Sequence, residues 1–277
     1  MMLKRLMLLV TGALALVPLS PAHADQLQDI KKKGELVCGV LGTDEPFSFV
    51  QDPASRAIVG YDVDLCNAVA KSLGVKTTIK QLTVSARIPE LQQGRIDLLA
   101  ASLTHNKERE TLIDFSLSTS ITGQKVMVKK QSGITQLDQL AGKKVLTVKG
   151  STMEQSIKKA VPTAVIISFD NSPQAFLALQ QGKGVAYVND ETSLIDDASK
   201  LGPVAKDYEI LPQNLSTEHL ALGLKKDEPA FREQVNKVLR DLEVSGEAEK
   251  LFTRWFGPAT KMKFPSRPFK LETDKID

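Results

Sequence analysis

The alternation of strand-like and helix-like segments is the feature that most constrains the fold of this chain. Glu35–Leu41 is an apolar stretch typical of a buried strand, and Asp62–Leu73 has the periodicity of a helix that ends at Gly74. A strand, a short helix and a buried strand follow at residues 76–82, 88–93 and 96–101. This order predicts a parallel sheet covered by helices.

A second module of the same kind follows a Ser/Thr-rich join at Ser116–Gly123. Its predicted strands lie at residues 126–129, 144–148, 164–168 and 185–188, and its predicted helices at 134–140, 150–160 and 172–181. The sequence therefore predicts two α/β modules in series. Spacing alone does not assign a later strand, at 219–224, or a helix capped by Asp227 to either module.

The first 24 residues are typical of an export signal. Lys4 and Arg5 precede an apolar run at residues 6–16, and a small-x-small cleavage site stands at residues 22–24. The run is about half of the length that a membrane span needs. We therefore expect cleavage after Ala24 and a soluble, periplasmic protein.

The charge of the chain excludes some partners. Residues 1–24 contain Lys4 and Arg5 and no acid, so their removal lowers the net charge from +3 to +1. A nearly neutral chain of mixed charge lacks the excess of positive charge that would attract nucleic acid or an anionic membrane. We expect neither as a partner.

No motif points to covalent chemistry. The sequence has no Gly-x-Ser-x-Gly elbow, no Walker loop and no cluster with metal-ligand spacing. Asp44 and Glu45 are explained by a turn before Pro46 more simply than by a catalytic acid pair. We therefore expect a protein that is not an enzyme and that has no cofactor or metal.

Cys38 and Cys66 are the only cysteines. Outside the cytoplasm they can form one disulfide. Buried in a strand and a helix, they can equally serve as small apolar side chains. The sequence leaves both alternatives open.

Polar residues directly follow the predicted strand at 96–101. Ser102, Thr104 and Arg109 would stand at the carboxyl end of a parallel strand, where ligands gather, and an arginine there can clamp a carboxylate. The alternative is a helix start capped by Thr104 or Asn106, with Arg109 in solvent. Spacing alone slightly favours that alternative.

The second module carries polar groups at matching places. Ser151 and Thr152 precede a helix whose N-terminus favours an anion, although ordinary capping explains them equally well. Asp190 follows the strand at 185–188 and can receive an ammonium, although an acidic loop residue often only meets water. Together these strand ends suit a zwitterion, so they predict an amino-acid site between the modules.

Short motifs stand in a fixed order along nearly the whole chain from Leu36 to Phe256. They are Pro46–Phe49, Gly60–Leu65, Arg87–Pro89, Thr104–Arg109, Asp114–Ser116 and Ser245–Ala248, followed by Trp255–Phe256. In order and spacing they resemble the periplasmic amino-acid-binding proteins of ABC importers, the family 3 solute-binding proteins. The resemblance implies a two-lobed type II fold, each lobe a mainly parallel sheet flanked by helices, with two crossover strands between them.

The resemblance also implies the extent of the lobes and their action. Residues 25–119 and 220–277 would form lobe 1, and residues 120–219 lobe 2. A monomer would close on its ligand about a hinge and deliver it to an ABC permease in the membrane.

The resemblance implies roles for individual residues. Arg109 would bind the ligand α-carboxylate, and Asp190 the α-ammonium. Hydroxyl and backbone groups from both lobes would assist Arg109, at Ser102, Thr104, Ser151 and Thr152.

Within the family, the chain is most similar to the glutamate/aspartate-binding branch. There the arginine at the position of Arg87 reaches the side-chain carboxylate. A second arginine of that branch falls at about Leu41, and a ligand histidine falls near Ser172. Glutamate and aspartate are therefore expected, with glutamine, asparagine and other polar amino acids left open.

Two other functions remain open at this point. The same architecture hosts exported dehydratases of cyclohexadienyl amino-acid precursors, which need a general acid, and no residue stands out for that role. A protein that presents its ligand to a sensor is the other alternative.

Overall fold

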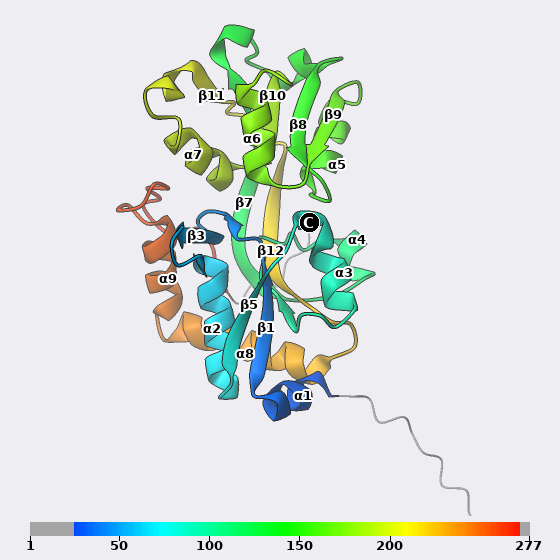
Figure 1. Cartoon of the computed structure of the whole chain (residues 1–277), viewed down its shortest axis with the longest axis vertical. Helices are drawn as coiled ribbons and strands as arrows, with labels where there is room; N and C mark the ends of the chain where they lie inside the picture. The colour runs from blue at the N-terminus through cyan, green and yellow to red at the C-terminus, as the bar shows by residue number, and fades with distance from the viewer. Residues whose placement is uncertain (1–24, 272–277) are drawn as a thin grey trace, which may run out of the picture.

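The computed structural model of the protein describes residues 25–271 and has two lobes, one above the other along the longest axis (Figure 1). β7 (Asp114–Lys129) and β12 (Ser216–Leu224) run through both lobes and pair antiparallel with each other. The predicted two-lobed α/β fold is confirmed.

Lobe 1 contains the first and last elements of the chain. Its helices are α1 Gln26–Lys33, α2 Tyr61–Leu73, α3 Arg87–Gln92, α4 Lys107–Glu110, α8 Pro229–Val244 and α9 Glu247–Phe256. Its strands are β1 Glu35–Val40, β2 Thr43–Asp44, β3 Ser48–Asp52, β4 Ala57–Val59, β5 Lys76–Gln81 and β6 Leu98–Leu99.

Lobe 2 contains the middle of the chain. Its strands are β8 Lys144–Val148, β9 Val165–Phe169, β10 Ala186–Asp190 and β11 Tyr208–Ile210, and its helices are α5 Met153–Ala160, α6 Ser172–Gln180 and α7 Glu191–Ser199. Short 3₁₀ helices lie at Val84–Ala86 in lobe 1 and at Lys130–Ser132, Leu137–Leu140 and Gly202–Asp207 in lobe 2.

One continuous sheet passes through both lobes, in the order β5-β1-β6-β12-β7-β10-β8-β9, with β11 also paired to β7. β5, β1 and β6 are parallel, and so are β10, β8 and β9. β12 and β7 run antiparallel to these neighbours. The lobe boundaries expected at residues 119/120 and 219/220 lie inside β7 and β12, and they stay a prediction.

The sheet of lobe 2 is buried on both faces. Val126, Val145 and Val188 pack into one apolar cluster, whereas the next residues along β7 and β8, Met127 and Leu146, pack into another on the opposite face. Successive side chains of a strand point to opposite faces. Burial of both faces is the physical reason why these strands are continuous apolar runs in the sequence.

Most predicted elements are confirmed, but two local predictions are wrong. The helix expected at 134–140 is only a 3₁₀ turn at Leu137–Leu140. Asp227 does not cap α8, because it has φ 62°, whereas an N-cap residue needs an extended backbone, and its N–H donates to Asp114 Oδ2 at 3.2 Å. Glu228 stands at the start of α8 instead.

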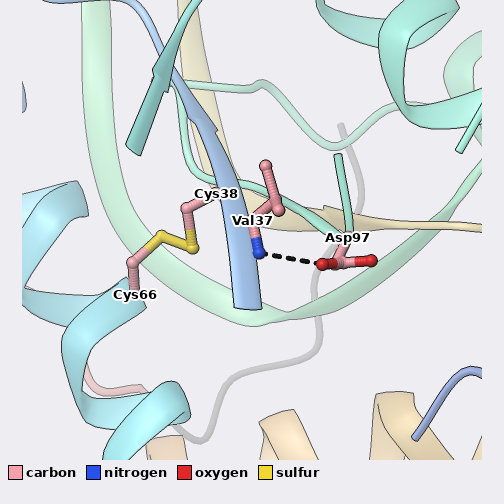
Figure 2. Close-up of a disulfide and its surroundings, with 4 residues drawn as sticks. All are labelled: Val37, Cys38, Cys66 and Asp97. Carbon is pink, nitrogen blue, oxygen red and sulfur yellow. Dashed lines mark hydrogen bonds between the residues drawn. A yellow bond between two sulfur atoms is a disulfide. The ribbon is translucent and has the colours of Figure 1, made fainter. Parts of the chain in front are cut away.

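The cysteines form a disulfide between β1 and α2, which decides between the two alternatives of the sequence (Figure 2). The Cα atoms of Cys38 and Cys66 lie 6.4 Å apart, and both side chains are fully buried. Nearby, the backbone N–H of Val37 donates to Asp97 Oδ2 at 2.8 Å. The strand that leads toward the centre of the molecule is thus fixed to its covering helix.

The predicted export signal, residues 1–24, lies outside the described residues. Within residues 25–271, no helix combines the length and the apolar character needed to cross a membrane.

We expect that replacing both cysteines by alanine lowers the free energy of unfolding by about 2–4 kcal/mol, because the bridge restricts the unfolded chain. Urea unfolding followed by circular dichroism measures this loss. Cys38 and Cys66 should resist alkylation until a reductant is added to the unfolded protein. Alkylation of both thiols without reductant would contradict the disulfide.

Candidate functional site

The two lobes touch where the strand ends of both sheets meet. The contacts come from strand β2, from the loops after β6 and β8 and from helices α4, α5 and α7. They are Thr104 Oγ1 to Thr152 Oγ1 (3.4 Å), Arg109 Nη2 to Gly150 O (3.3 Å), Ser193 Oγ to Asp44 Oδ1 (2.8 Å) and Gln155 Nε2 to Glu108 Oε2 (2.9 Å). The structure is therefore a closed form, in which groups from both lobes enclose the junction.

Gly150 allows the lobes to approach this closely. Its φ is +76°, and a Cβ at this position would lie 3.0 Å from the Cα and 3.2 Å from the Cβ of Ser85 in the opposite lobe. Both the backbone conformation and the lack of space require glycine here.

Arg109 is held inside the junction rather than in solvent. Only 9% of it is exposed, and its Nη1 donates to Thr104 O at 3.0 Å. Its backbone N–H donates to the side chain of Asn106, which caps α4 as one alternative predicted. Burial lowers the pKa of Arg109, and nearby Glu218 opposes the shift. The alternative that left Arg109 in solvent is wrong, because the side chain is buried and its Nη2 donates to Gly150 O of lobe 2.

Thr152 is fixed by side chains of both crossover strands. Gln124 Nε2, from β7, donates to Thr152 Oγ1 at 2.7 Å, and that hydroxyl donates to Glu218 Oε2, from β12, at 3.2 Å. Ser151 differs, since its hydroxyl donates to Val148 O within its own turn. Sequence reasoning missed Gln124 and Glu218, although a polar residue that interrupts a buried strand is a usable signal.

Asp190 at the end of β10 is buried and lacks a partner for one oxygen. It is 7% exposed, and its Oδ1 has no hydrogen-bond partner among the described residues. Burial raises its pKa well above the usual range, and the charges of Asp44 and Glu218 add to the effect. A buried carboxylate oxygen needs a donor or a cation. Asp190 is therefore a buried residue of the junction and not an exposed loop acid.

Arg87 is a second buried arginine, and it interacts with the charges of Arg109, Asp44, Asp190 and Asp62. Its Nε donates to Val84 O at 3.0 Å, and its Nη1 donates to Ala101 O at 2.8 Å and to Ser102 O at 3.2 Å. Nη2 has no hydrogen-bond partner within residues 25–271. Burial, followed by repulsion from Arg109, lowers the pKa of Arg87 to about 9, so the side chain stays cationic at neutral pH.

Ser102 connects two buried acids that sequence reasoning did not place in the site. With φ 46°, it donates its N–H to Asp62 Oδ2 at 2.9 Å and its hydroxyl to Asp44 Oδ2. Burial raises the pKa of Asp44, and it raises that of Asp62 to about 7. The expected turn lies at residues 45–47, and Asp44 stands directly before it in β2, where the fold also brings it against Ser102 and Ser193.

The positions that would hold further side-chain ligands in the glutamate/aspartate branch do not supply a cation. Leu41 is 7% exposed and belongs to an apolar cluster with Leu82 and Leu99. Ser172 accepts a hydrogen bond from Asn189 Nδ2 at 3.2 Å. Arg87 is therefore without a second cation from either position.

Two surface pockets help to delimit the site. One, of about 350 Å³, borders the junction and is lined by both lobes, including Thr104, Thr152 and Glu218. A larger one, of about 610 Å³, lies on lobe 1 and contacts none of the predicted site residues. We place the site at the junction, because the buried charges lie there. Within residues 25–271, no group of His, Cys, Asp or Glu is arranged to hold a metal ion.

The fold and the closed junction define the class: a two-lobed binding protein with buried charges between its lobes. The profile of the bacterial extracellular solute-binding proteins, family 3, matches residues 36–258, and the chain belongs to this family. It is thus an amino-acid-binding solute-binding protein of the kind that serves ABC importers.

Curated relatives bind different amino acids. The glutamine-binding protein GlnH of an ABC transporter from Bacillus subtilis is 33% identical over 83% of this chain and 84% of its own. The L-glutamate/L-aspartate-binding protein of Pseudomonas aeruginosa is 31% identical over 90% of this chain and 87% of its own.

Solved structures agree with the fold. A mutant of ArgBP from T. maritima superposes with a TM-score of 0.78 and 31% identity, over 83% of this chain and 99% of its own. An ancestral amino-acid-binding protein, described as a precursor of cyclohexadienyl dehydratase, gives 0.75 and 31%, over 83% and 99%. The comparisons favour a binding role over an enzymatic one.

We expect Asp62→Asn to change the pH dependence of stability. The folded protein holds a proton on Asp62 up to about pH 7, whereas the unfolded chain releases it near pH 4. This carboxyl therefore makes its full contribution to stability below pH 4, and the contribution is lost as the pH rises to 7. In the variant, the free energy of unfolding should fall less steeply with pH, by up to about 1.4 kcal/mol per pH unit. Urea unfolding of the ligand-free protein between pH 4 and 8 measures it, and an unchanged slope would contradict the shift.

We expect Gly150→Ala to hinder closure, because its Cβ meets Ser85. Small-angle X-ray scattering with saturating ligand should show a larger radius of gyration than wild type, and calorimetry should show weaker binding. Gly142→Ala is the matched control, since Gly142 has φ +69° and nothing within 4 Å of its Cβ position. Equal effects of both substitutions would attribute the change to backbone strain alone.

Proposed function

We propose that this protein captures a polar amino acid between its lobes, in the periplasm, and delivers it to an ABC permease. One observation carries the proposal: a buried arginine, Arg109, and a buried acid with an unpartnered oxygen, Asp190, occupy the same closed junction. An α-amino acid supplies the two charges that such a pair lacks.

The ligand would be held by its α-carboxylate and its α-ammonium. Arg109 would bind the carboxylate, since a guanidinium pairs with two carboxylate oxygens at once. Thr104 and Thr152 lie beside it from opposite lobes, and Ser102 and Ser151 would contribute hydroxyl or backbone groups. Asp190 would accept from the ammonium, which gives its Oδ1 a partner.

Closure would couple binding to transport. β7 and β12 connect the lobes, so a change in their backbone angles can open the junction without unfolding either lobe. A ligand shifts this equilibrium only by binding the closed form more tightly than the open form. Groups of both lobes around Arg109 provide that difference, and a permease would then recognise the closed monomer.

The proposal also concerns which amino-acid side chain the ligand carries. Relatives are described as binders of glutamine, of glutamate and aspartate, and of cystine. Glutamate or aspartate is the sequence-based expectation, and it depends on Arg87. The acids beside Arg87 make the neutral amides equal candidates, so a screen must contain both.

We expect Arg109→Ala to weaken amino-acid binding at least about 30-fold, because it removes one member of a buried charge pair. Calorimetric titration with the amino acid that most raises the thermal midpoint of the wild type measures the loss. Arg240→Ala is the control, since Arg240 is an exposed arginine of lobe 1 that pairs with Glu233. Unchanged affinity in the folded Arg109 variant would refute the assignment.

The same preparation tests the enzymatic alternative. We expect no turnover of prephenate or arogenate in a spectrophotometric assay. If the wild type turns over either compound and Asp62→Asn or Asp190→Asn abolishes the turnover, the proposed transport function is wrong and the protein is a dehydratase.

A further inference from the structure

The segment of residues 259–271 makes a further contact between the lobes. It follows α9 and lies beyond the part of the chain that the family profile matches, which ends at residue 258. In Figure 1 this segment, in red, runs from α9 toward α7. Its Lys261 Nζ lies 3.2 Å from Asp196 Oδ1 in α7 of lobe 2 and 3.0 Å from Glu45 Oε2 in lobe 1. Lys261 therefore adds an ion pair between the lobes from a part of the chain that the profile does not cover.

The segment is packed onto lobe 1. The side chains of Met262, Phe269 and Leu271 are buried in the apolar core of this lobe. The backbone N–H of Phe264 donates to Phe256 O, at the end of α9, at 2.9 Å. These contacts give the segment a fixed course beside α9.

An ion pair also holds the end of the segment on lobe 1. Arg267 Nη1 donates to Glu243 Oε2 of α8 at 2.7 Å, and the backbone N–H of Leu271 donates to the same oxygen at 2.9 Å. The side chains of Arg267 and Glu243 are 8% and 12% exposed, so salt screens their attraction less than that of a surface pair. Lys261 therefore moves with lobe 1, and its distance from Asp196 depends on how far the lobes are open.

The two acids beside Lys261 respond differently to opening. Glu45 belongs to lobe 1, as the segment does, so its pair with Lys261 can persist in an open form. Asp196 belongs to lobe 2 and its side chain is 5% exposed, so its pair with Lys261 is made only in the closed form. Because the Lys261 side chain is 45% exposed, the pair contributes a moderate bias toward closure and does not lock the lobes.

We propose that residues 259–271 act as a latch that favours the closed form, through the ion pair of Lys261 with Asp196. The inference rests on the proposed opening and closing of the lobes, and it does not depend on which amino acid binds. An interaction made only in the closed form raises the closed fraction, and the apparent affinity rises with that fraction. Lys261 thus adjusts affinity through Glu45 and Asp196, which are not among the residues assigned to the ligand.

The test is calorimetric titration of the purified protein, freed of bound amino acid by unfolding in guanidinium and refolding. The probe is the one of the twenty amino acids that most raises the thermal midpoint of the wild type. Lys261→Met removes the charge and keeps an unbranched side chain, and we expect it to weaken binding roughly threefold to tenfold. Asp196→Asn should weaken binding to a similar extent. The double variant should lose no more than either single variant, because both substitutions remove the same pair.

Two controls remove ion pairs that lie within one lobe. Glu45→Gln removes the partner of Lys261 in lobe 1, and Lys200→Met removes the partner of Asp196 within α7. Neither pair crosses the junction, so both variants should keep the affinity of the wild type. Lys261→Gln is a second latch variant, for use if thermal unfolding shows that Lys261→Met does not fold.

The outcomes separate the latch from the proposed function. Wild-type affinity in the folded Lys261 variant, or an equal loss in either control, would overturn the latch. A double variant whose loss is the product of the two single losses would overturn it as well. If Arg109→Ala abolishes binding and the Lys261 variant does not change it, the proposed function stands without the latch. A wild type that binds none of the twenty amino acids would overturn both.

Discussion

The cost of burying charge is the constraint on which the rest of this structure depends. In this closed form, the side chains of Arg87, Arg109, Asp44 and Asp190 have little contact with water. A charge without water needs a partner, because its desolvation outweighs most single contacts. Backbone carbonyls and hydroxyls satisfy much of this need, and the unpartnered oxygen of Asp190 shows where a ligand would complete it.

The strand topology of the fold brings these charged residues together. Each lobe has its own set of parallel strands in one continuous sheet, and the antiparallel pair β7–β12 joins the two sets. Elements that are far apart in the sequence, such as β2 with Asp44 and α7 with Ser193, therefore meet. The same pair is the connection about which the lobes would open, so binding and motion depend on one element.

Much of the fold was predictable from the sequence, because local patterns determine local structure. The apolar runs of β8 and β10 and the helix ending at Gly74 follow from burial and backbone preference. The failures lie where tertiary contacts override local signals: Asp227 is not a cap, and the helix expected at 134–140 is a single turn. In the site, Arg109 and Asp190 were predicted individually, but their burial was not.

By itself the sequence determined the α/β order, the family resemblance and the residues that would bind the two ends of an amino acid. These are properties of the chain order and of side-chain chemistry. Only the tertiary structure decided that Cys38 and Cys66 are joined, that Leu41 belongs to the apolar core and that Asp44 and Arg87 both contact Ser102. Pairing in space between distant segments is not encoded in any local pattern. For that reason, the contacts between the two lobes could be examined only in the folded protein.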